Sequence, residues 1–386
     1  MSRLIRESLK TWLSQSSNGY LHASMLPNAC FTDNSFYEID MKLNPSKFNY
    51  IGHCQQLKKE GDYISTDIGN VPIIVVKKED TTKGFVNVCQ HRAATILDPS
   101  GVDGHSCLNT GGKIRCQYHG WEYNLDGRLT KAVKLSGVSG FKAKDISLAP
   151  ITLKFIGPFI FGKVEAHNGN KTTFEDDYPN IEEELFSGIP ASDYNFVTRK
   201  TYNLSCNWKV FADNYLDGGY HVSTIHTGLT SQLDMKSYYS KIFKNYSVQF
   251  VGSKANSPET ELVGKEVPGR IYGVARYAWL FPATAINIYG PWIDVHIVKP
   301  VTANSCTVNF DYFLNKNANL SEEEIEKALK ASDTVQQEDI KICQQVQTGL
   351  ESGQYRPGRY GATEELSFDF GRTYANEVLA YVESTN

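Results

Sequence analysis

The apolar positions of this chain first follow the short alternation that is typical of β-strands. Between about residues 48 and 164, segments rich in β-branched residues are separated by turns of Gly, Asn and Asp. The strands predicted in this part cover residues 62–66, 71–76 and 84–88. Such short strands with frequent turns favour a small all-β domain.

Longer strands and a long helix are predicted in the second half of the chain. The strands, rich in aromatic and β-branched residues, are 194–204, 244–251, 272–281, 285–289, 294–299 and 307–314. The clearest helix begins at Ser321, where Ser321 and Glu324 form a capping box, and runs to about Gly349. We therefore predict an α+β chain, with a small all-β domain followed by a larger domain of long strands and long helices.

A length of 386 residues fits two domains of this kind. We place the small domain at 45–164 and the large one at 165–386. Residues 1–44 form an N-terminal segment that packs on the large domain. The first 23 residues carry apolar side chains at roughly helical spacing and three basic residues against one acid, so they fit either an amphipathic helix or an organellar presequence.

Composition excludes several classes of protein. A net charge of −4 gives no reason to expect a nucleic-acid partner or an anionic membrane surface. No apolar run approaches the ~20 residues that cross a bilayer. Eight cysteines spread over the whole length are not a disulfide framework. These features indicate a reducing compartment, either the cytoplasm or an organelle stroma or matrix.

Two Cys-His pairs carry the first candidate chemistry. Cys89 precedes His91 by two residues, and Cys116 precedes His119 by three. A Cys2His2 set could bind zinc, but zinc fingers pair Cys with Cys and His with His. Mixed pairs suit a [2Fe–2S] cluster of the Rieske type, in which two thiolates hold one iron and two imidazoles hold the other. The cluster is the favoured interpretation, with structural zinc as the alternative.

A second histidine pair follows a Gly-Gly sequence. His221 and His226 are five residues apart, which in a regular helix leaves their side chains ~140° apart. The backbone must therefore depart from helical geometry for both imidazoles to reach one ion. Gly218 and Gly219 allow such a departure. Taken alone, the pair is weak support for a metal site.

Asp339 supplies a third candidate ligand. It is the only charge in the apolar stripe of the long helix, whose other members are Val335, Ile342, Val346 and Leu350. A carboxylate on a buried face needs a cation, either Lys or Arg or a metal. Two histidines and one carboxylate form the facial triad of Fe(II) oxygenases. The neighbouring Glu338 is expected to point elsewhere.

These motifs resemble the Rieske non-haem iron oxygenases, and in particular their choline monooxygenase-like branch. The similarity extends from about Phe31 to Tyr360. The segments that carry it are 214–226, with the His pair, 335–351, with Asp339, and the sequence Tyr-Gly-Pro-Trp at 289–292. One departure is the loop between His91 and Cys116, which is longer than usual in the family. His105 and Cys107 lie in that loop and are interpreted as bystanders.

The resemblance implies two iron centres and a defined fold. Cys89, His91, Cys116 and His119 would bind the [2Fe–2S] cluster, and His221, His226 and Asp339 would bind mononuclear Fe(II), with O2 as co-substrate. The large domain would have an antiparallel sheet and long helices of the helix-grip type, and the protein would be a homotrimer. Because no Gly-x-Gly-x-x-Gly motif follows a strand, a separate ferredoxin or NAD(P)H-dependent reductase would supply electrons.

Five aromatic residues are candidates for substrate binding, namely Tyr277, Trp279, Phe281, Tyr289 and Trp292. They could form a cage for a quaternary ammonium through cation–π attraction, or simply a sheet core. The predicted activity is a monooxygenase that hydroxylates choline to betaine aldehyde hydrate. The alternatives are demethylation of a betaine- or carnitine-like amine, hydroxylation of an aromatic acid, and a Rieske electron carrier without catalysis.

The route of the electron to the iron is a further expectation from the resemblance. Many Rieske oxygenases have an acidic residue three positions before the first iron histidine, and it bridges to a cluster histidine of the neighbouring subunit. Here that position is Gly218, which cannot bridge. We expect Asp217 to take this role, with Asp213 as the second candidate.

Overall fold

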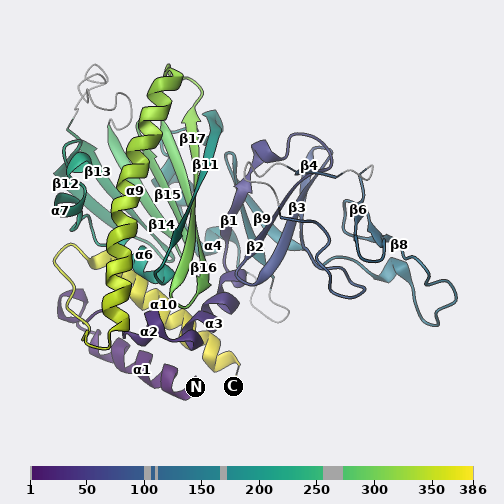
Figure 1. The fold of residues 1–386 in the computed structure, drawn as a ribbon, viewed down its shortest axis with the longest axis horizontal. Helices are drawn as coiled ribbons and strands as arrows, with labels where there is room; N and C mark the ends of the chain where they lie inside the picture. Colours follow the sequence, from purple (N-terminus) through teal and green to yellow (C-terminus); the bar gives the residue numbers. More distant parts are fainter. Residues whose placement is uncertain (1, 100–105, 109–111, 166–171, 255–272, 386) are drawn as a thin grey trace. The chain divides into compact units, whose positions relative to one another are not determined.

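The chain is described by a computed structural model that covers residues 2–99, 106–108, 112–165, 172–254 and 273–385. Its internal contacts define two units, residues 44–174 and residues 1–43 together with 175–386 (Figure 1). In the enlarged loop predicted between His91 and Cys116, residues 100–105, which include His105, and 109–111 lie outside the described residues. Cys107 is described and belongs to a short strand.

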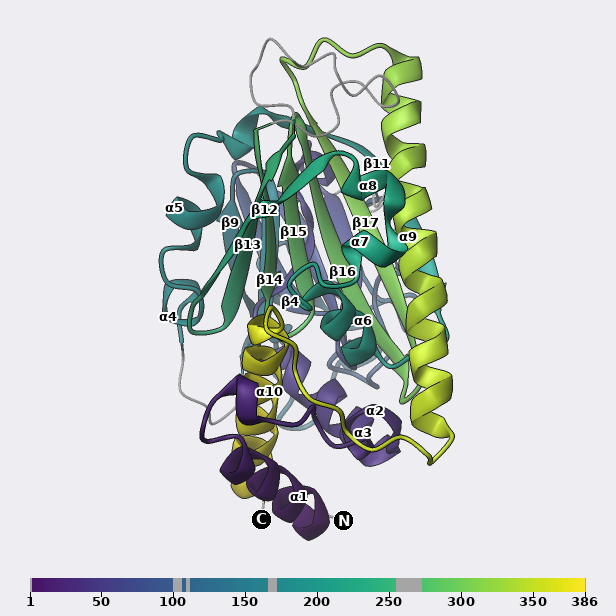
Figure 2. The ribbon, with the colours of Figure 1, turned by 90° about the vertical axis from the view of Figure 1, so that its left-hand side faces the viewer.

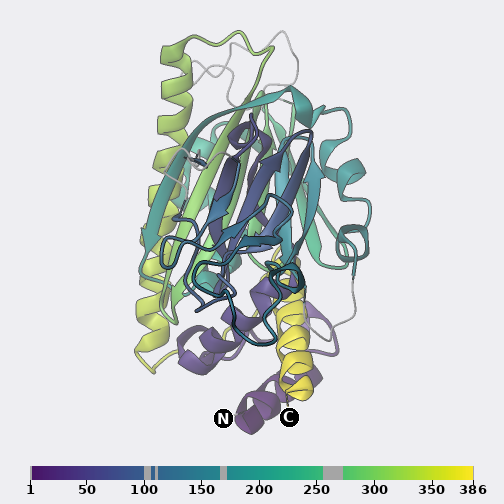
Figure 3. The same cartoon turned by 90° about the vertical axis from the view of Figure 1, so that its right-hand side faces the viewer.

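The small unit consists of three antiparallel sheets, with strand orders β1-β10-β9, β4-β3-β2-β5 and β6-β7-β8 (Figure 3). Its strands are β1 Asn49–His53, β2 Asp62–Ile68, β3 Val71–Lys78, β4 Thr81–Val86, β5 Ser106–Cys107, β6 Ile114–Arg115, β7 Glu122–Tyr123, β8 Leu129–Lys131, β9 Ile151–Ile156 and β10 Phe159–Val164. The unit extends past the predicted boundary at 164/165 to Phe174. The Phe174 ring lies 5.2 Å from the rings of both Phe48 and Phe161, which ties it to this core.

The large unit has one seven-stranded antiparallel sheet with the order β11-β17-β16-β15-β14-β13-β12. Its strands are β11 Tyr194–Leu204, β12 Leu233–Ile242, β13 Tyr246–Ser253, β14 Val274–Leu280, β15 Thr284–Tyr289, β16 Trp292–Thr302 and β17 Ser305–Asn315. Six of these match predicted strands within a few residues, whereas β12 was not predicted. The predicted α+β class, with an antiparallel sheet and long helices in the second domain, is confirmed.

The helices are α1 Ser2–Gln15, α2 Ala29–Thr32, α3 Asn34–Leu43, α4 Phe174–Asp177, α5 Ile181–Phe186, α6 Trp208–Tyr215, α7 Val222–Ile225, α8 Thr227–Thr230, α9 Glu322–Glu351 and α10 Glu365–Ser384. Short 3-10 turns cover Tyr20–His22, Asn44–Ser46, Cys54–Gln56, Ala143–Asp145 and Ala191–Asp193. Among the described helices, none combines the length and apolar character that a bilayer span requires. The N-terminal helix α1 packs on α10, where the Trp12 ring lies 6.1 Å from that of Phe368.

Helix α9 runs along the sheet beside β11 and β17 (Figure 2). Its N-terminus has the predicted capping box, in which Glu324 N–H donates to Ser321 Oγ and Ser321 N–H donates to Glu324 Oε2. The Tyr202 hydroxyl donates to Asp333 at 2.9 Å, and the hydroxyls of Tyr312 and Ser332 lie 3.0 Å apart. These contacts fix α9 on the sheet, and with it every side chain that α9 directs towards the sheet.

A buried ion pair joins three helices of the large unit. Lys209 of α6 donates to Asp40 of α3 at 2.6 Å, and both side chains are almost fully buried. The same carboxylate accepts from Trp208 Nε1 at 2.8 Å and from the Tyr374 hydroxyl of α10 at 2.9 Å. Each carboxylate oxygen therefore has a donor, which a buried charge requires. This network holds α6 in place, and α6 leads into the histidine pair.

We predict that Asp40→Ala lowers the free energy of unfolding by about 3–5 kcal/mol, because it leaves the Lys209 charge buried without a partner. Denaturant titration followed by tryptophan fluorescence measures the loss. Glu383→Gln is the control, since it breaks the exposed pair with Lys10 in the same unit and should leave the midpoint almost unchanged. Equal midpoints for Asp40→Ala and the unmodified protein would contradict the role given to this pair.

Candidate metal centres and the adjoining cavity

Two loops of the small unit present the Cys-His pairs with the same backbone pattern. Cys89 N–H donates to the carbonyl of residue 94, and the N–H of Ala93 donates back to the Cys89 carbonyl. Cys116 makes the same two bonds with Trp121 and Gly120. The fourth residue after each cysteine has a positive φ, 58° at Ala93 and 68° at Gly120. Each loop therefore makes a tight turn that begins at its cysteine, and the two loops share one backbone geometry.

The four predicted cluster ligands gather between these loops. Cys89 and Cys116 are buried, and burial is the main cause that raises the pKa of the Cys116 thiol, to which the adjacent Cys89 adds. The imidazole rings of His91 and His119 lie 4.5 Å apart, and His91 stacks on Trp121 at 4.8 Å. His91 Nδ1 is buried without a hydrogen-bond partner, which fits an atom that binds a metal.

The contacts group the four side chains in the way that a two-iron cluster needs. The Cys89 and Cys116 thiols interact with each other, and the His91 and His119 rings do the same. Tetrahedral zinc needs all four ligand atoms around one point. A two-iron cluster instead binds its thiolate pair and its imidazole pair to different metals.

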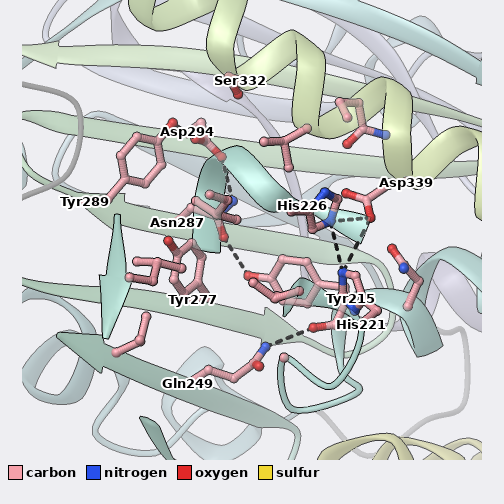
Figure 4. Close-up of a pocket in the computed structure, with 18 of the residues that line it drawn as sticks. Tyr215, His221, His226, Gln249, Tyr277, Asn287, Tyr289, Asp294, Ser332 and Asp339 are labelled. Carbon is pink, nitrogen blue, oxygen red and sulfur yellow. Dashed lines mark hydrogen bonds and ion pairs between the residues drawn. The ribbon is translucent and has the colours of Figure 1, made fainter. Parts of the chain in front are cut away.

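The second centre lies in the large unit, between the α6–α8 segment and α9. His226 Nε2 is 3.1 Å from His221 Nε2 and 3.0 Å from Asp339 Oδ1, and His221 Nε2 is 3.6 Å from the same oxygen. Figure 4 shows the three side chains pointing toward one another. His226 is buried, and the other two are only slightly exposed.

A carboxylate holds each imidazole at its other nitrogen. Asp217 Oδ2 lies 2.6 Å from His221 Nδ1, and Glu338 Oε2 lies 2.7 Å from His226 Nδ1. The expectation that Glu338 points away from the site is therefore wrong. Glu338 stands beside Asp339 on α9, and its longer side chain reaches around the helix to the far edge of the His226 ring.

These contacts determine which nitrogen of each imidazole carries the proton, and therefore whether the three side chains can bind a metal. With both Nδ1 atoms donating to carboxylates, both Nε2 atoms present lone pairs. Two lone pairs and a carboxylate oxygen then face one another at 3.0–3.6 Å, which is repulsive without a cation between them. Burial alone would lower the pKa of His226, but Asp339 and Glu338 outweigh it and raise that pKa. The donor set is the one that Fe(II) takes in a facial triad.

The local backbone explains how histidines five apart can meet. His221 precedes the single turn of α7, and His226 leaves helical geometry with a ψ of 68°. The change of direction that the spacing required occurs at His226 itself. Gly218 and Gly219 have φ values of 72° and 71° and form the tight entry to this turn. A Cβ at Gly218 would lie 2.0 Å from the Thr363 carbonyl oxygen, so no side chain fits at that position.

The two candidates for the bridging carboxylate differ in their contacts. Asp217 binds the backbone N–H of His221 as well as its ring. Asp213 makes no hydrogen bond or ion pair with a histidine among the described residues, and burial, followed by the charge of Glu364, raises its pKa to about 8. Both line a second cavity of about 440 Å³ that lies on the other side of His221 from the first. Of the two, only Asp217 touches a proposed metal ligand.

A cavity of about 160 Å³ opens beside the three convergent side chains. Tyr277 and Tyr289 line it, as the sequence predicted for substrate residues, and Tyr215, Tyr238 and Phe310 add further aromatic surface. The other three candidates do not line it. Trp279 and Phe281 pack against Phe370 of α10, and Trp292 packs beneath α9 against Ala328 and Leu329. These three rings belong to the core rather than to the cavity.

Sequence reasoning missed the polar wall of this cavity. Asn287 of β15 and Asp294 and His296 of β16 line it, and all three are buried. Figure 4 shows Asn287 and Asp294 joined by a hydrogen bond. The sequence did contain a signal for this wall. Asp294 and His296 are two residues apart in an otherwise apolar strand, and residues with that spacing share one face of the sheet.

Comparison with protein families matches both units. Residues 47–142 match the Rieske [2Fe–2S] domain, and residues 191–380 match the catalytic domain of the ring hydroxylating alpha subunit. These matches contain the loops of the Cys-His pairs and the three convergent side chains, respectively.

Individual relatives agree with these matches. The chloroplastic choline monooxygenase of Arabidopsis thaliana is 36% identical over 90% of this chain and 81% of its own length. The carnitine monooxygenase oxygenase subunit of Escherichia coli is 27% identical over 92% and 93%. A quaternary ammonium Rieske monooxygenase solved with L-carnitine shares the fold, with a TM-score of 0.76, 23% identity and coverage of 92% and 96%. The chain therefore belongs to the Rieske non-haem iron oxygenases, as a choline monooxygenase-like enzyme that uses O2 with a [2Fe–2S] cluster and a mononuclear iron.

Proposed function

We propose that this enzyme hydroxylates a trimethylammonium compound, with choline as its substrate. The observation that carries the proposal is the cavity, in which the His221, His226 and Asp339 group adjoins a space lined by aromatic rings. Aromatic faces attract a quaternary ammonium, which cannot donate a conventional hydrogen bond. The similarity to the Arabidopsis choline monooxygenase supports the same substrate class.

Each centre is assigned to its own residues. Cys89, His91, Cys116 and His119 hold the cluster, and His221, His226 and Asp339 hold the mononuclear iron. When bound, the two centres supply one-electron transfer and activation of O2 next to the substrate. Asp217 and Glu338 keep the Nδ1 proton on their histidines, so that each Nε2 presents a lone pair.

The cavity determines which bond is attacked. With the trimethylammonium group against the tyrosine faces, the carbon that bears the hydroxyl lies toward the three convergent side chains. Insertion of one oxygen atom into its C–H bond gives betaine aldehyde hydrate. The other oxygen atom leaves as water, with two external electrons and two protons. A separate ferredoxin or NAD(P)H-dependent reductase supplies these electrons.

Electron transfer is assigned to contacts between subunits of a homotrimer. Asp217 already binds His221 in its own chain. Its carboxylate would bridge to His91 or His119 of the partner subunit, because Gly218 leaves no room for an acidic side chain. None of the eight described cysteines forms a disulfide, which supports a reducing compartment, either the cytoplasm or an organelle stroma or matrix.

Oxidation of a carnitine-like amine is the second candidate. Similarity to the E. coli carnitine monooxygenase subunit favours it, at lower identity than to choline monooxygenase. A substrate comparison under turnover distinguishes the two, since carnitine would be cleaved next to nitrogen, whereas choline would give the aldehyde hydrate.

Metal content tests the assignment of the triad. The purified protein should contain about three iron atoms per chain. Asp339→Ala should lose the mononuclear iron and all turnover yet keep the visible spectrum of the cluster. His91→Ala should lose that spectrum and keep the mononuclear iron. Turnover by Asp339→Ala at the unmodified rate would refute the triad.

Single-turnover kinetics test the bridging carboxylate. Asp217→Asn keeps the size of the side chain and should leave both metal sites filled and substrate bound. Oxidation of the reduced cluster by O2 and substrate should slow by about 10- to 100-fold, since a carboxylate partner orients a metal-bound imidazole. Asp213→Asn is the matched comparison and should change the rate little. If Asp213→Asn slowed cluster oxidation more than Asp217→Asn did, the bridging role would belong to Asp213.

Substrate binding tests the aromatic faces. Tyr277→Leu should raise the half-saturating concentration of choline by about tenfold, because one cation–π face contributes on the order of 1–2 kcal/mol. Trp292→Phe serves as the control from outside this cavity and should leave that concentration unchanged. Similar effects of the two substitutions would mean that the tyrosine acts through packing alone.

A further inference from the structure

A buried carboxylate stands in the wall of the cavity beside the triad. Asp294 lies on β16 and is only 2% exposed. Its Oδ1 accepts from Asn287 Nδ2 at 2.8 Å and from His296 Nε2 at 2.5 Å, and its Oδ2 accepts from the Tyr289 hydroxyl. Asn287 lies directly opposite on β15, so the sheet register itself sets this contact.

The orientation of these donors is fixed in turn. The Tyr215 hydroxyl donates to Asn287 Oδ1 at 2.6 Å, which turns the amide nitrogen toward Asp294. The His296 ring stacks on Phe310, with ring centroids 3.4 Å apart. The carboxylate is thus rigidly held at the cavity, without any role in the triad.

Asp294 carries a charge that no described cation offsets. None of the described side chains that contact it or line the cavity is Lys or Arg. His296 is 4% exposed, and its Nδ1 has no hydrogen-bond partner. A second proton on this ring would bury an unpaired charged N–H, which is costly, so His296 is neutral and donates through Nε2.

A buried anion of this kind is stabilised when a cation enters the adjacent space. The cavity beside it is lined by Tyr277, Tyr215 and Tyr238, and aromatic rings of this kind suit methylated nitrogen. Figure 4 shows Asp294 and Tyr289 at one end of the drawn residues and the three convergent side chains at the other. A ligand with its charge at one end and its reacting carbon at the other fits this arrangement.

We propose that Asp294 is the counter-charge for the ammonium group and restricts the substrate to cations that carry no carboxylate. The proposal rests on the proposed function and names its substrate class more narrowly. A zwitterion such as carnitine would bring its carboxylate into a cavity whose described wall contains Asp294 and no Lys or Arg. The neutral hydroxyl of choline meets no such repulsion.

Equilibrium binding to the holoenzyme, without an electron donor, distinguishes recognition of the ligand's charge from recognition of its shape. The probes are choline, its neutral isostere 3,3-dimethylbutan-1-ol and L-carnitine, each titrated calorimetrically. The unmodified protein should bind choline at least about thirtyfold more tightly than either of the other two. That ratio corresponds to about 2 kcal/mol.

The variant Asp294→Asn keeps the size of the side chain and removes its charge. It should weaken choline binding about thirtyfold and leave the neutral isostere unchanged. Glu326→Gln is the control, since it removes a negative charge from an exposed position of α9 outside the cavity and should leave all three affinities unchanged. If Asp294→Asn fails to fold, the three affinities of the unmodified protein decide alone.

The outcomes distinguish two kinds of failure. If the unmodified protein binds the isostere as tightly as choline, or carnitine more tightly, the counter-charge is refuted while the enzyme remains a trimethylammonium oxygenase. If folded Asp294→Asn binds choline as tightly as the unmodified protein does, the counter-charge is likewise refuted. If no trimethylammonium compound binds or turns over, the proposed function fails together with it.

Discussion

The structure depends on two imidazoles that each make a hydrogen bond to a carboxylate at Nδ1. Asp217 and Glu338 occupy the Nδ1 atoms of His221 and His226, which forces their Nε2 atoms to face each other at 3.1 Å. Two facing lone pairs repel each other, a cation between them relieves that repulsion, and Asp339 provides the third ligand atom. Much of the large unit serves to keep these groups in register. The buried Lys209–Asp40 pair fixes α6, and hydrogen bonds to β11 and β17 fix α9.

The sheet contributes the opposite wall of the site. Its middle strands, β15 and β16, are almost fully buried, yet they carry Asn287, Asp294 and His296 on the cavity side. Buried polar groups in a sheet core are unfavourable unless every one finds a partner. Here the partners come from one another and from two tyrosine hydroxyls, with His296 Nδ1 as the exception, and one net negative charge faces the cavity. The same fold thus places a metal at one wall and a charge for the substrate at another.

The sequence allowed some of this to be predicted because certain constraints are local. The capping box at Ser321 depends on residues three apart, and the triad was marked by Asp339 in an apolar stripe. Trp279 was misplaced because alternation along a strand gives the face but not the position along it, and two residues amount to about 6–7 Å. Helix α10 was missed, although Leu366, Phe370, Tyr374, Val378 and Val382 recur every fourth residue and are all buried. Glu338 and Asn287 could not be assigned, because their partners are distant in sequence and only the fold brings them together.

Anomalous diffraction from crystals of the holoenzyme soaked with choline tests the central claim most directly. Maps recorded on both sides of the iron absorption edge locate iron without reference to activity. We predict one iron peak among His221 Nε2, His226 Nε2 and Asp339, a second centre between the Cys-His loops, and choline density with its ammonium end at Asp294. Iron at the loops alone, or a peak at the triad that persists below the iron edge as zinc would, would contradict the account.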